Sequence, residues 1–230
     1  MPSVAALHIQ MEGFTAFFKH PLTITGTQIS LPCPPYSTLL GMISAIAGRV
    51  ISPRETRIGF EFHCASRDIE IEKTDRLALN RGVLAPHREG QGVLKRYIYF
   101  RPELDLYVTD LELEQAFLSP VSTPCLGRSQ DIAWVKHVEK VELTEKSSGK
   151  IGPTLLPEIQ MNIPSLLVRC PEWFENAVEG RTRIAGPFGF YQGLMPTTKE
   201  RFDISMSNLY HPSNMKEPCD VVYLHEWLRK

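Results

Sequence analysis

The chain has 230 residues, 43% of them hydrophobic, and its 25 Lys and Arg residues nearly balance its 26 Asp and Glu residues. The net charge of −1 gives no overall sign of nucleic-acid binding, so such a role requires local segregation of charge. The five cysteines form no C-x-x-C pair, and neither a signal peptide nor an apolar run long enough to span a membrane is present. We therefore expect a soluble cytoplasmic protein with reduced thiols.

The N-terminal segment predicts a strand followed by an irregular loop. Residues 4–11 alternate in polarity, and His8 lies opposite the most apolar face, so we expect it to be a structural histidine. Residues 14–29 mix phenylalanines with Lys19 and His20. This loop could grip RNA by stacking and charge, or its phenylalanines could simply pack beneath it.

Residues 32–48 predict a buried helix with a sharp start. Three prolines keep the backbone extended before the helix, and Ser37 or Thr38 can act as the N-cap. Residues 39–47 are apolar on nearly every side, which is typical of a core helix. The helix N-terminus, with Tyr36 beside it, presents N–H groups and a positive dipole end, and is therefore a candidate phosphate site.

A basic excursion follows the second predicted strand, residues 58–72. Residues 74–92 show no clear periodicity, and residues 73–101 contain seven basic residues against two acidic ones. Charge runs are usually solvated faces, but a basic, glycine-rich excursion between two strands is also typical of a hairpin that grips nucleic acid, and we favour that interpretation. The basic residues are Lys73, Arg76, Arg81, Arg88, Lys95, Arg96 and Arg101, with His87 in addition.

The next elements complete a strand–helix–strand, strand–helix–strand order. They are strands at 96–100 and 104–108, a short helix at 111–118, a turn at 124–131 and a strand at 132–144. This order predicts an α+β fold with a split βαβ, ferredoxin-like core over residues 1–145.

We expect the C-terminal part, residues 146–230, to be a β-rich extension. The polar segment 146–150 predicts a loop at the boundary. Residues 154–169 favour one or two strands, and residues 221–227 a final strand or docked tail. The segment 186–193 is rich in glycine and aromatic residues but lacks the spacing of a dinucleotide site, so packing is favoured over stacking on a base.

The sequence holds no recognisable metal or cofactor motif. Its seven histidines are scattered, and there is neither a phosphate loop nor a serine-nucleophile elbow, so we expect no cofactor and no metal. One enzymatic alternative stays open, a metal-independent ribonuclease that uses Tyr36, Lys136 and His137. On a regular strand Lys136 and His137 point to opposite faces, which weakens them as a cooperating pair.

Two motifs taken together resemble a known family. The segment P-P-Y-S-T-L-L-G-M at residues 34–42 opens the predicted helix, and L-G-R-S at residues 126–129 lies in the turn. Over roughly residues 1–140, the pair resembles the CRISPR-associated protein family five, a subunit of type I Cascade complexes within the RAMP superfamily. The residues of the first motif are most similar to those of the type I-B branch.

The resemblance implies an RRM-like core with a protruding basic β-hairpin thumb, here within residues 73–101. It implies a subunit for antiviral defence in a prokaryotic cytoplasm, which binds the repeat-derived 5′ handle of the CRISPR RNA. Its expected partners are that handle, the backbone subunit and the large subunit, with target DNA reached only through the complex and no membrane. The residues expected to bind RNA are Lys19, His20, Tyr36, Ser37, Thr38, Arg76, Arg81, His87, Arg88, Lys95, Arg96, Gly127, Arg128 and Ser129.

Some relatives, of the type I-C branch, cut precursor RNA themselves with a tyrosine near the end of the first helix and a Lys-His pair. Here the helix ends in Ala47-Gly48 without that tyrosine, and Lys136-His137 does not align clearly with the pair. We therefore expect a non-catalytic, handle-binding subunit. A metal-independent endoribonuclease that processes precursor CRISPR RNA is the alternative, and an RNA-independent scaffold of the same fold is a third possibility.

Overall fold

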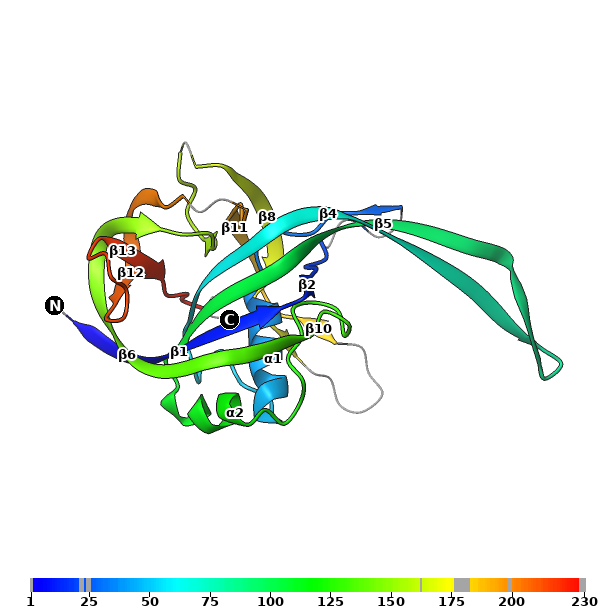
Figure 1. Ribbon diagram of the computed structural model, residues 1–230, viewed down its shortest axis with the longest axis horizontal. Helices are drawn as coiled ribbons and strands as arrows, with labels where there is room; N and C mark the ends of the chain where they lie inside the picture. The colour runs from blue at the N-terminus through cyan, green and yellow to red at the C-terminus, as the bar shows by residue number, and fades with distance from the viewer. Residues whose placement is uncertain are drawn as a thin grey trace.

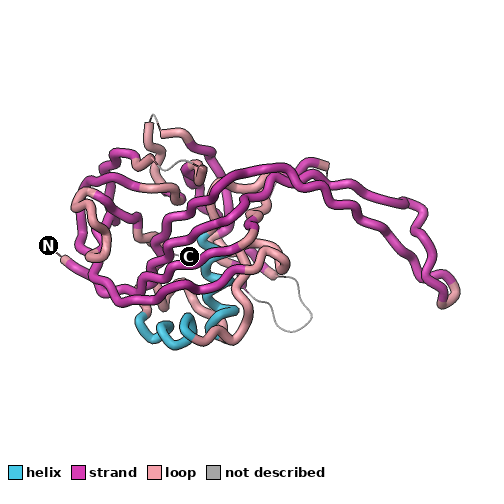
Figure 2. Tube along the Cα trace, viewed as in Figure 1, coloured by secondary structure: helices cyan, strands magenta, loops and turns pink. Residues whose placement is uncertain are grey.

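The computed structural model describes residues 2–20, 23, 26–161, 163–175, 183–197 and 200–227, and these residues are mostly β-strand (Figure 1, Figure 2). Strand β1 (Ser3–Gly13) lies between β5 (Val83–Val108) and β6 (Ala133–Ile151). Strand β4 (Ile58–Asn80) pairs with β5. All three pairings are antiparallel, so the strands follow the spatial order β6, β1, β5, β4.

Helices connect these strands at two places. Helix α1 (Tyr36–Ala47) lies between β1 and β4 in the chain, and its Leu39 and Ile43 are fully buried in the main core. It ends at Gly48, whose φ of 67° is the left-handed conformation that closes many helices. The predicted second helix consists of a 3-10 turn, η1 (Leu111–Leu113), and α2 (Glu114–Leu118). Both predicted helices are confirmed.

Strands β4 and β5 continue far beyond the sheet as a two-stranded arm, which projects from the rest of the molecule (Figure 1). We define the arm as residues 67–99, because Arg67 pairs with Tyr99 where the strands leave the core. The sequence predicted strands separated at Pro102 and an aperiodic segment over 74–92. Instead β5 is continuous through Pro102, and residues 74–92 belong to the paired strands and their turn.

The arm has a tight tip and a bend. Arg81 and Gly82 join the strands with φ values of 51° and 81°, the conformation of a two-residue type I′ hairpin turn. At the bend Asp75 pairs with Gln91 but Leu77 pairs with Pro86, so β5 carries extra residues there. A bulge of this kind increases the local twist and changes the strand direction.

Short strands fix the loop after β1 against the base of the arm. Strand β2 (Thr15–Ala16) and strand β3 (Thr27–Gln28) both pair with β5. Phe17 and Phe18 are buried between them, whereas Lys19 is exposed. Phe17 and Phe18 therefore pack beneath the loop, whereas Phe14 is 70% exposed.

The C-terminal residues extend the same sheet, and the predicted boundary loop is wrong. Residues 146–150 lie inside β6, because strand β12 (Phe202–Pro212) pairs with them. Strand β13 (Asp220–Tyr223) also pairs with β6, and Val221 is buried in the same core as α1. The remaining strands are β7 (Leu155–Leu156), β8 (Ser165–Pro171), β9 (Phe174–Glu175), β10 (Ile184–Ala185) and β11 (Phe188–Leu194).

The sheet face opposite α1 holds a polar cluster around the buried His8. Its Nε2 lies 2.8 Å from Asp105 Oδ1 and its Nδ1 lies 3.1 Å from Glu139 Oε1. The ring stacks on Tyr107 with centroids 4.7 Å apart, and Asn214 Nδ2 donates to Glu139 at 2.7 Å. His8 is therefore a structural residue, as predicted.

Candidate nucleic-acid interface

A cavity of about 330 Å³ lies where the loop after β1, the N-terminus of α1, the base of the arm and the turn before β6 meet. Sequence-distant motifs thus converge on one place. The lining residues are Phe17, Phe18, Lys19, Gln28, Pro35, Thr38, Arg96, Gly127 and Arg128.

The N-terminus of α1 opens onto this cavity, but its cap differs from the prediction. Pro35 is the N-cap residue, and its carbonyl accepts the N–H groups of Thr38 and Leu39 at 2.9 and 3.1 Å. No side chain caps the helix, so the expectation that Ser37 or Thr38 would do so is wrong. The N-cap lies two or three residues earlier than predicted, because the extended Pro35 already supplies the turn-closing carbonyl. The positive end of the helix dipole therefore faces the cavity.

The turn before β6 needs glycine at position 127. The Phe17 N–H donates to the Leu126 carbonyl at 3.1 Å, which holds the turn against the loop after β1. Gly127 has a φ of 116°, and a Cβ there would overlap the Phe17 carbonyl group. Only a residue without a Cβ can adopt this conformation at such close approach.

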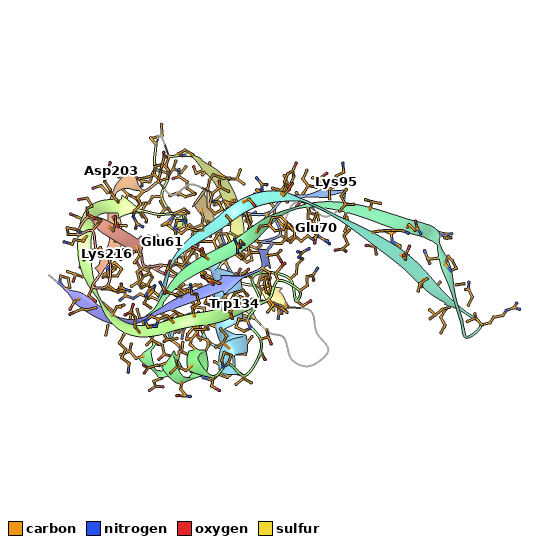
Figure 3. The ribbon with its side chains drawn as sticks, in the orientation of Figure 1. Glu61, Glu70, Lys95, Trp134, Asp203 and Lys216 are labelled. Atoms are coloured by element: carbon orange, nitrogen blue, oxygen red, sulfur yellow. The ribbon has the colours of Figure 1, made fainter. Side chains whose placement is uncertain are left out.

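Arg128 is fixed by a buried carboxylate and by the arm. Its Nε and Nη2 donate to the two oxygens of Asp131 at 2.9 and 2.8 Å, and its Nη1 donates to Glu70 of β4. Asp131 is fully buried. The hydrogen bonds to Asp131 and Glu70 raise the pKa of Arg128 despite its partial burial. The Arg128 guanidinium thus links the turn before β6 to Glu70 of the arm, which is labelled in Figure 3.

Arg96 is held in a similar way and contacts the same Phe17 ring. Its Nε donates to Gln28 at 2.9 Å, and its Nη1 pairs with Glu72. The Cζ atoms of Arg96 and Arg128 lie 5.7 and 5.4 Å from the Phe17 ring centroid. Phe17 is therefore a cation–π partner of two arginines.

These pairings weaken the predicted segregation of charge. Glu70 and Glu72 precede the basic segment in the sequence, yet they lie beside Arg96 and Arg128. Residues 67–99 contain seven basic and five acidic residues, a smaller excess than residues 73–101 suggested. The count along the chain overlooked the acidic strand that pairs with the basic one.

The predicted RNA-binding residues fall into separate groups. Lys19, Thr38, Arg96, Gly127 and Arg128 line the cavity, as described above. Ser37 is half-buried and precedes Thr38, and Ser129 is exposed and follows Arg128. His20 follows Lys19, and Lys95 is exposed at the base of the arm (Figure 3). Arg76, His87 and Arg88 lie at the bend of the arm, and Arg81 lies at its tip.

Tyr36 is a correction, because its side chain belongs to the core. It is 1% exposed, its hydroxyl donates to the Leu155 carbonyl at 2.8 Å, and its ring stacks on His225 with centroids 3.8 Å apart. Burial raises the pKa of the phenol well above its usual range. The Tyr36 side chain therefore cannot reach an RNA at the cavity.

The ribonuclease alternative requires residues that the structure keeps apart. Lys136 and His137 line a different cavity, next to α2, which does not include Tyr36 or Arg128. Lys136 Nζ pairs with Glu12 Oε1 at 2.5 Å. Within the described ranges, no group of His, Cys, Asp and Glu side chains could hold a metal ion, and none of the described helices has the length and hydropathy to cross a membrane.

Sequence reasoning missed the partners that organise the cavity. Gln28, Glu70, Glu72 and Asp131 position its arginines. Asp131 stands three residues after Arg128, and that spacing within a turn was the available signal. The roles of Glu70 and Glu72 depend on strand register, which a single sequence does not reveal.

Three of the similar solved structures come from CRISPR systems. A chain of a CRISPR RNA-guided surveillance complex is 15% identical with a TM-score of 0.48, over 90% of this chain and 91% of that chain. A CRISPR protein from Archaeoglobus fulgidus is 13% identical with a TM-score of 0.48, over 95% and 98% of the two chains. A chain of the type III-B Cmr-beta complex bound to cognate target RNA and AMPPnP is 10% identical with a TM-score of 0.44, over 86% of each.

No family model matches the sequence, and no curated protein matches it. The identities lie below 25% and the TM-scores below 0.5. The function proposed next therefore rests on the residues of this chain.

Proposed function

We propose that this chain is the subunit of a type I CRISPR Cascade complex that holds the repeat-derived 5′ handle of the CRISPR RNA without cutting it. The observation that carries the proposal is the shared cavity. The P-P-Y-S-T-L-L-G-M motif places Pro35 and Thr38 there, and the L-G-R-S motif places Gly127 and Arg128 there. The two motifs whose residues resemble one family thus also line the same cavity.

The fold supports the same assignment. The antiparallel order β6, β1, β5, β4, with helices between β1 and β4 and between β5 and β6, is that of a ferredoxin-like unit. The arm takes the place of the thumb, and its bend and tip carry Arg76, Arg88 and Arg81. We propose type I-B as the nearest branch, and this proposal rests on the residues of the first motif alone.

The cavity offers groups suited to a single RNA strand. The dipole end of α1 and the exposed Lys19 ammonium favour a phosphate, and the Ser129 hydroxyl next to Arg128 can hydrogen-bond a base edge or a ribose. Arg128 uses only part of its donor set on Asp131 and Glu70. The arm would then follow the strand with its distal cations, and the backbone and large subunits would contact other faces.

Handle binding is tested with purified protein, alone and in its assembled complex. A labelled RNA that carries the repeat-derived handle is compared with a scrambled RNA of equal length and composition. We expect the handle to bind roughly tenfold more tightly, a difference of about 1.4 kcal/mol. Equal affinity for the two RNAs in both preparations would contradict the proposal.

The absence of cleavage is part of the proposal and has its own test. The buried, hydrogen-bonded Tyr36 phenol and the separate location of Lys136 and His137 support a binding role. Labelled repeat RNA is incubated with the protein in EDTA, and we expect it to stay intact. Specific cleavage that disappears in a His137→Ala variant would assign the chain to the metal-independent endoribonucleases instead.

A further inference from the structure

The base of the arm has two faces that differ in charge. Residues directly across an antiparallel pair share a face, and neighbours along a strand point to opposite faces. Glu70 pairs with Arg96, which lines the cavity, so the opposite face points away from the cavity. Lys95 lies on that opposite face (Figure 3). We call it the Tyr97 face, and it consists of Arg67, Ile69 and Ile71 of β4 and Val93, Lys95 and Tyr97 of β5.

The Tyr97 face carries cations without acidic partners. On the cavity side of the arm, Glu70 and Glu72 offset the charge of Arg96. The Tyr97 face contains neither Asp nor Glu, and among the residues that the structure describes no carboxylate forms an ion pair with Arg67 or Lys95. The Lys95 side chain is exposed. Unpaired cations on a surface attract a polyanion such as a nucleic-acid backbone.

Arg67 and Tyr97 form a stack at the centre of this face. The Cζ atom of Arg67 lies 4.5 Å from the Tyr97 ring centroid and 6.0 Å from that of Tyr99. The Arg67 Nε is buried and has no hydrogen-bond partner within the described ranges, so aromatic rings and not a carboxylate hold the guanidinium. Arg67 and Tyr97 are only half-buried. A stacked guanidinium and ring offer the flat, positively charged surface on which unpaired bases stack.

Exposed aliphatic side chains flank the stack. Ile69, Ile71 and Val93 are 49%, 66% and 59% exposed. At the outer end of the face the charge is balanced, because Lys73 lies 3.7 Å from Asp75. The centre of a protein–protein interface is depleted of charged residues, whereas sites for single-stranded nucleic acid combine cations with flat surfaces. The Tyr97 face has the second composition.

We propose that the Tyr97 face binds a single strand of RNA at the base of the arm. A base stacks on Tyr97 and Arg67, a neighbouring base packs on Ile69, and the phosphates lie beside Lys95. This inference rests on the proposed function only in taking the strand to be part of the CRISPR RNA. It adds a second RNA surface, on the side of the arm that faces away from the cavity, and two residues, Arg67 and Tyr97, that belong to neither motif.

Stacking is tested by removing the ring and by keeping it. Affinity for a labelled RNA that carries the handle and a single-stranded extension is measured for Tyr97→Ala and Tyr97→Phe. We expect Tyr97→Ala to bind about tenfold more weakly and Tyr97→Phe to bind like the wild type. The control is Phe190→Ala, which removes a 72% exposed ring from β11, outside the arm, and should change nothing. Unchanged affinity in Tyr97→Ala overturns the proposal, and so does an equal loss in Tyr97→Phe.

The phosphate contact has a separate test that leaves the arm intact. Lys95→Gln changes an exposed side chain, and its binding is titrated over a series of salt concentrations. We expect the slope of log affinity against log salt to become shallower by about 0.7, the value for one phosphate of a single strand. Lys136→Gln, at another exposed lysine, is the control. An unchanged slope in Lys95→Gln contradicts the proposal.

Two comparisons separate this inference from its alternatives. Variants that bind RNA like the wild type but fail to enter the assembled complex would assign the face to a protein subunit and overturn the proposal. The same titrations are repeated with scrambled RNA. A wild type without preference for the handle, whose binding still depends on Tyr97, would refute the proposed function and leave this inference standing. A wild type that prefers the handle, with Tyr97→Ala unimpaired, would refute this inference alone.

Discussion

Lys19 is the cavity-lining cation with an exposed side chain, whereas Arg96 and Arg128 are held by acidic partners. A Lys19→Ala variant should therefore bind the handle several-fold more weakly without losing stability, since loss of one phosphate contact costs about 1 kcal/mol. Binding titrations and thermal unfolding measure the two effects. The matched control is Lys136→Ala, which removes an exposed lysine from the cavity next to α2. A larger loss of RNA affinity in the control would place the RNA elsewhere.

Gly127 is a residue whose replacement tests the geometry of the turn. A Gly127→Ala variant forces a Cβ against the Phe17 carbonyl at a φ of 116°, and we expect it to destabilise the fold by about 1–3 kcal/mol. Gly41→Ala is the control, because a Cβ at Gly41 meets no neighbour within 4 Å. That change should stabilise α1 by up to about 1 kcal/mol. Urea unfolding measures the free energy of unfolding of both variants. Equal values for Gly127→Ala and Gly41→Ala would contradict the close approach of Gly127 to the Phe17 carbonyl.

At the scale of elements, the arm is a separable part of the molecule. Asp75 and Gln91 pair directly, so an Asn-Gly turn between them can replace residues 76–90. We expect the melting temperature to change by no more than about 3 °C, since the removed residues project away from the core (Figure 1). Handle affinity should fall because Arg76, Arg81 and Arg88 are lost.

Two outcomes of the arm truncation would count against its assignment. Unchanged handle affinity would show that the distal part of the arm does not grip RNA, and a large fall in melting temperature would show that it supports the core. A full-length variant with alanine at Arg76, Arg81 and Arg88 is the control for charge. It should reproduce most of the loss in affinity, because the arm keeps its shape but, with four basic and five acidic residues left, its bend and tip no longer attract phosphate.

Elements with a strong local pattern could be predicted from the sequence. The apolar run after Pro35 predicts α1, and the alternation around His8 predicts β1, because each pattern has the period of its element. The arm was harder to predict from the sequence, since its residues alternate only weakly in polarity and a bulge interrupts the strand pairing near Asp75. Residues 146–150 look like a loop on their own. They form a strand because β12, more than fifty residues later, pairs with them.

The candidate site was predictable only in part for the same reason. The two motifs that line the cavity could be recognised from their residues, but the burial of the Tyr36 side chain in the core could not be predicted from them. Its burial depends on Leu155 and His225, which lie far along the chain. Likewise Glu70 and Glu72 neutralise Arg96 and Arg128 through strand pairing, so a charge count along the sequence overestimated the basic surface.

At the scale of the whole molecule, charge is distributed unevenly over the sheet. The face opposite α1 carries carboxylates from adjacent strands, since Glu12 pairs with Glu103, Gln10 with Asp105 and His8 with Glu139. Phosphate would be repelled there. RNA should therefore lie at the cavity and the arm and not across the open sheet face, where many RRM domains stack their bases.

The cluster around His8 makes global stability depend on pH. Burial lowers the His8 pKa, but the hydrogen bonds and charges of Asp105 and Glu139 outweigh it and raise the value. The protonated ring therefore stabilises the fold below the unfolded pKa of about 6.5, and this contribution is lost as pH rises through the folded value. The pKa values of Asp105 and Glu139 are lowered, so their contribution is present above about pH 4 and lost in acid.

A His8→Gln variant isolates this contribution. The wild type should exceed the variant in unfolding free energy most clearly between about pH 5 and pH 6.5, and the difference should shrink at higher pH. Urea unfolding over a pH series measures it, and the same series for His137→Gln, an exposed histidine, serves as the control. A difference that grows with rising pH would refute a protonated His8.

The location of the RNA is tested most directly by cross-linking. A handle RNA with 4-thiouridine at each position is irradiated in the complex, and the attached peptides are identified by mass spectrometry. We expect cross-links to Lys19, to residues 127–129 and to the bend of the arm around Arg88, because the cavity and the arm line one path. Cross-links confined to the open sheet face around Gln10 and His137, with none at the cavity, would contradict the proposed site.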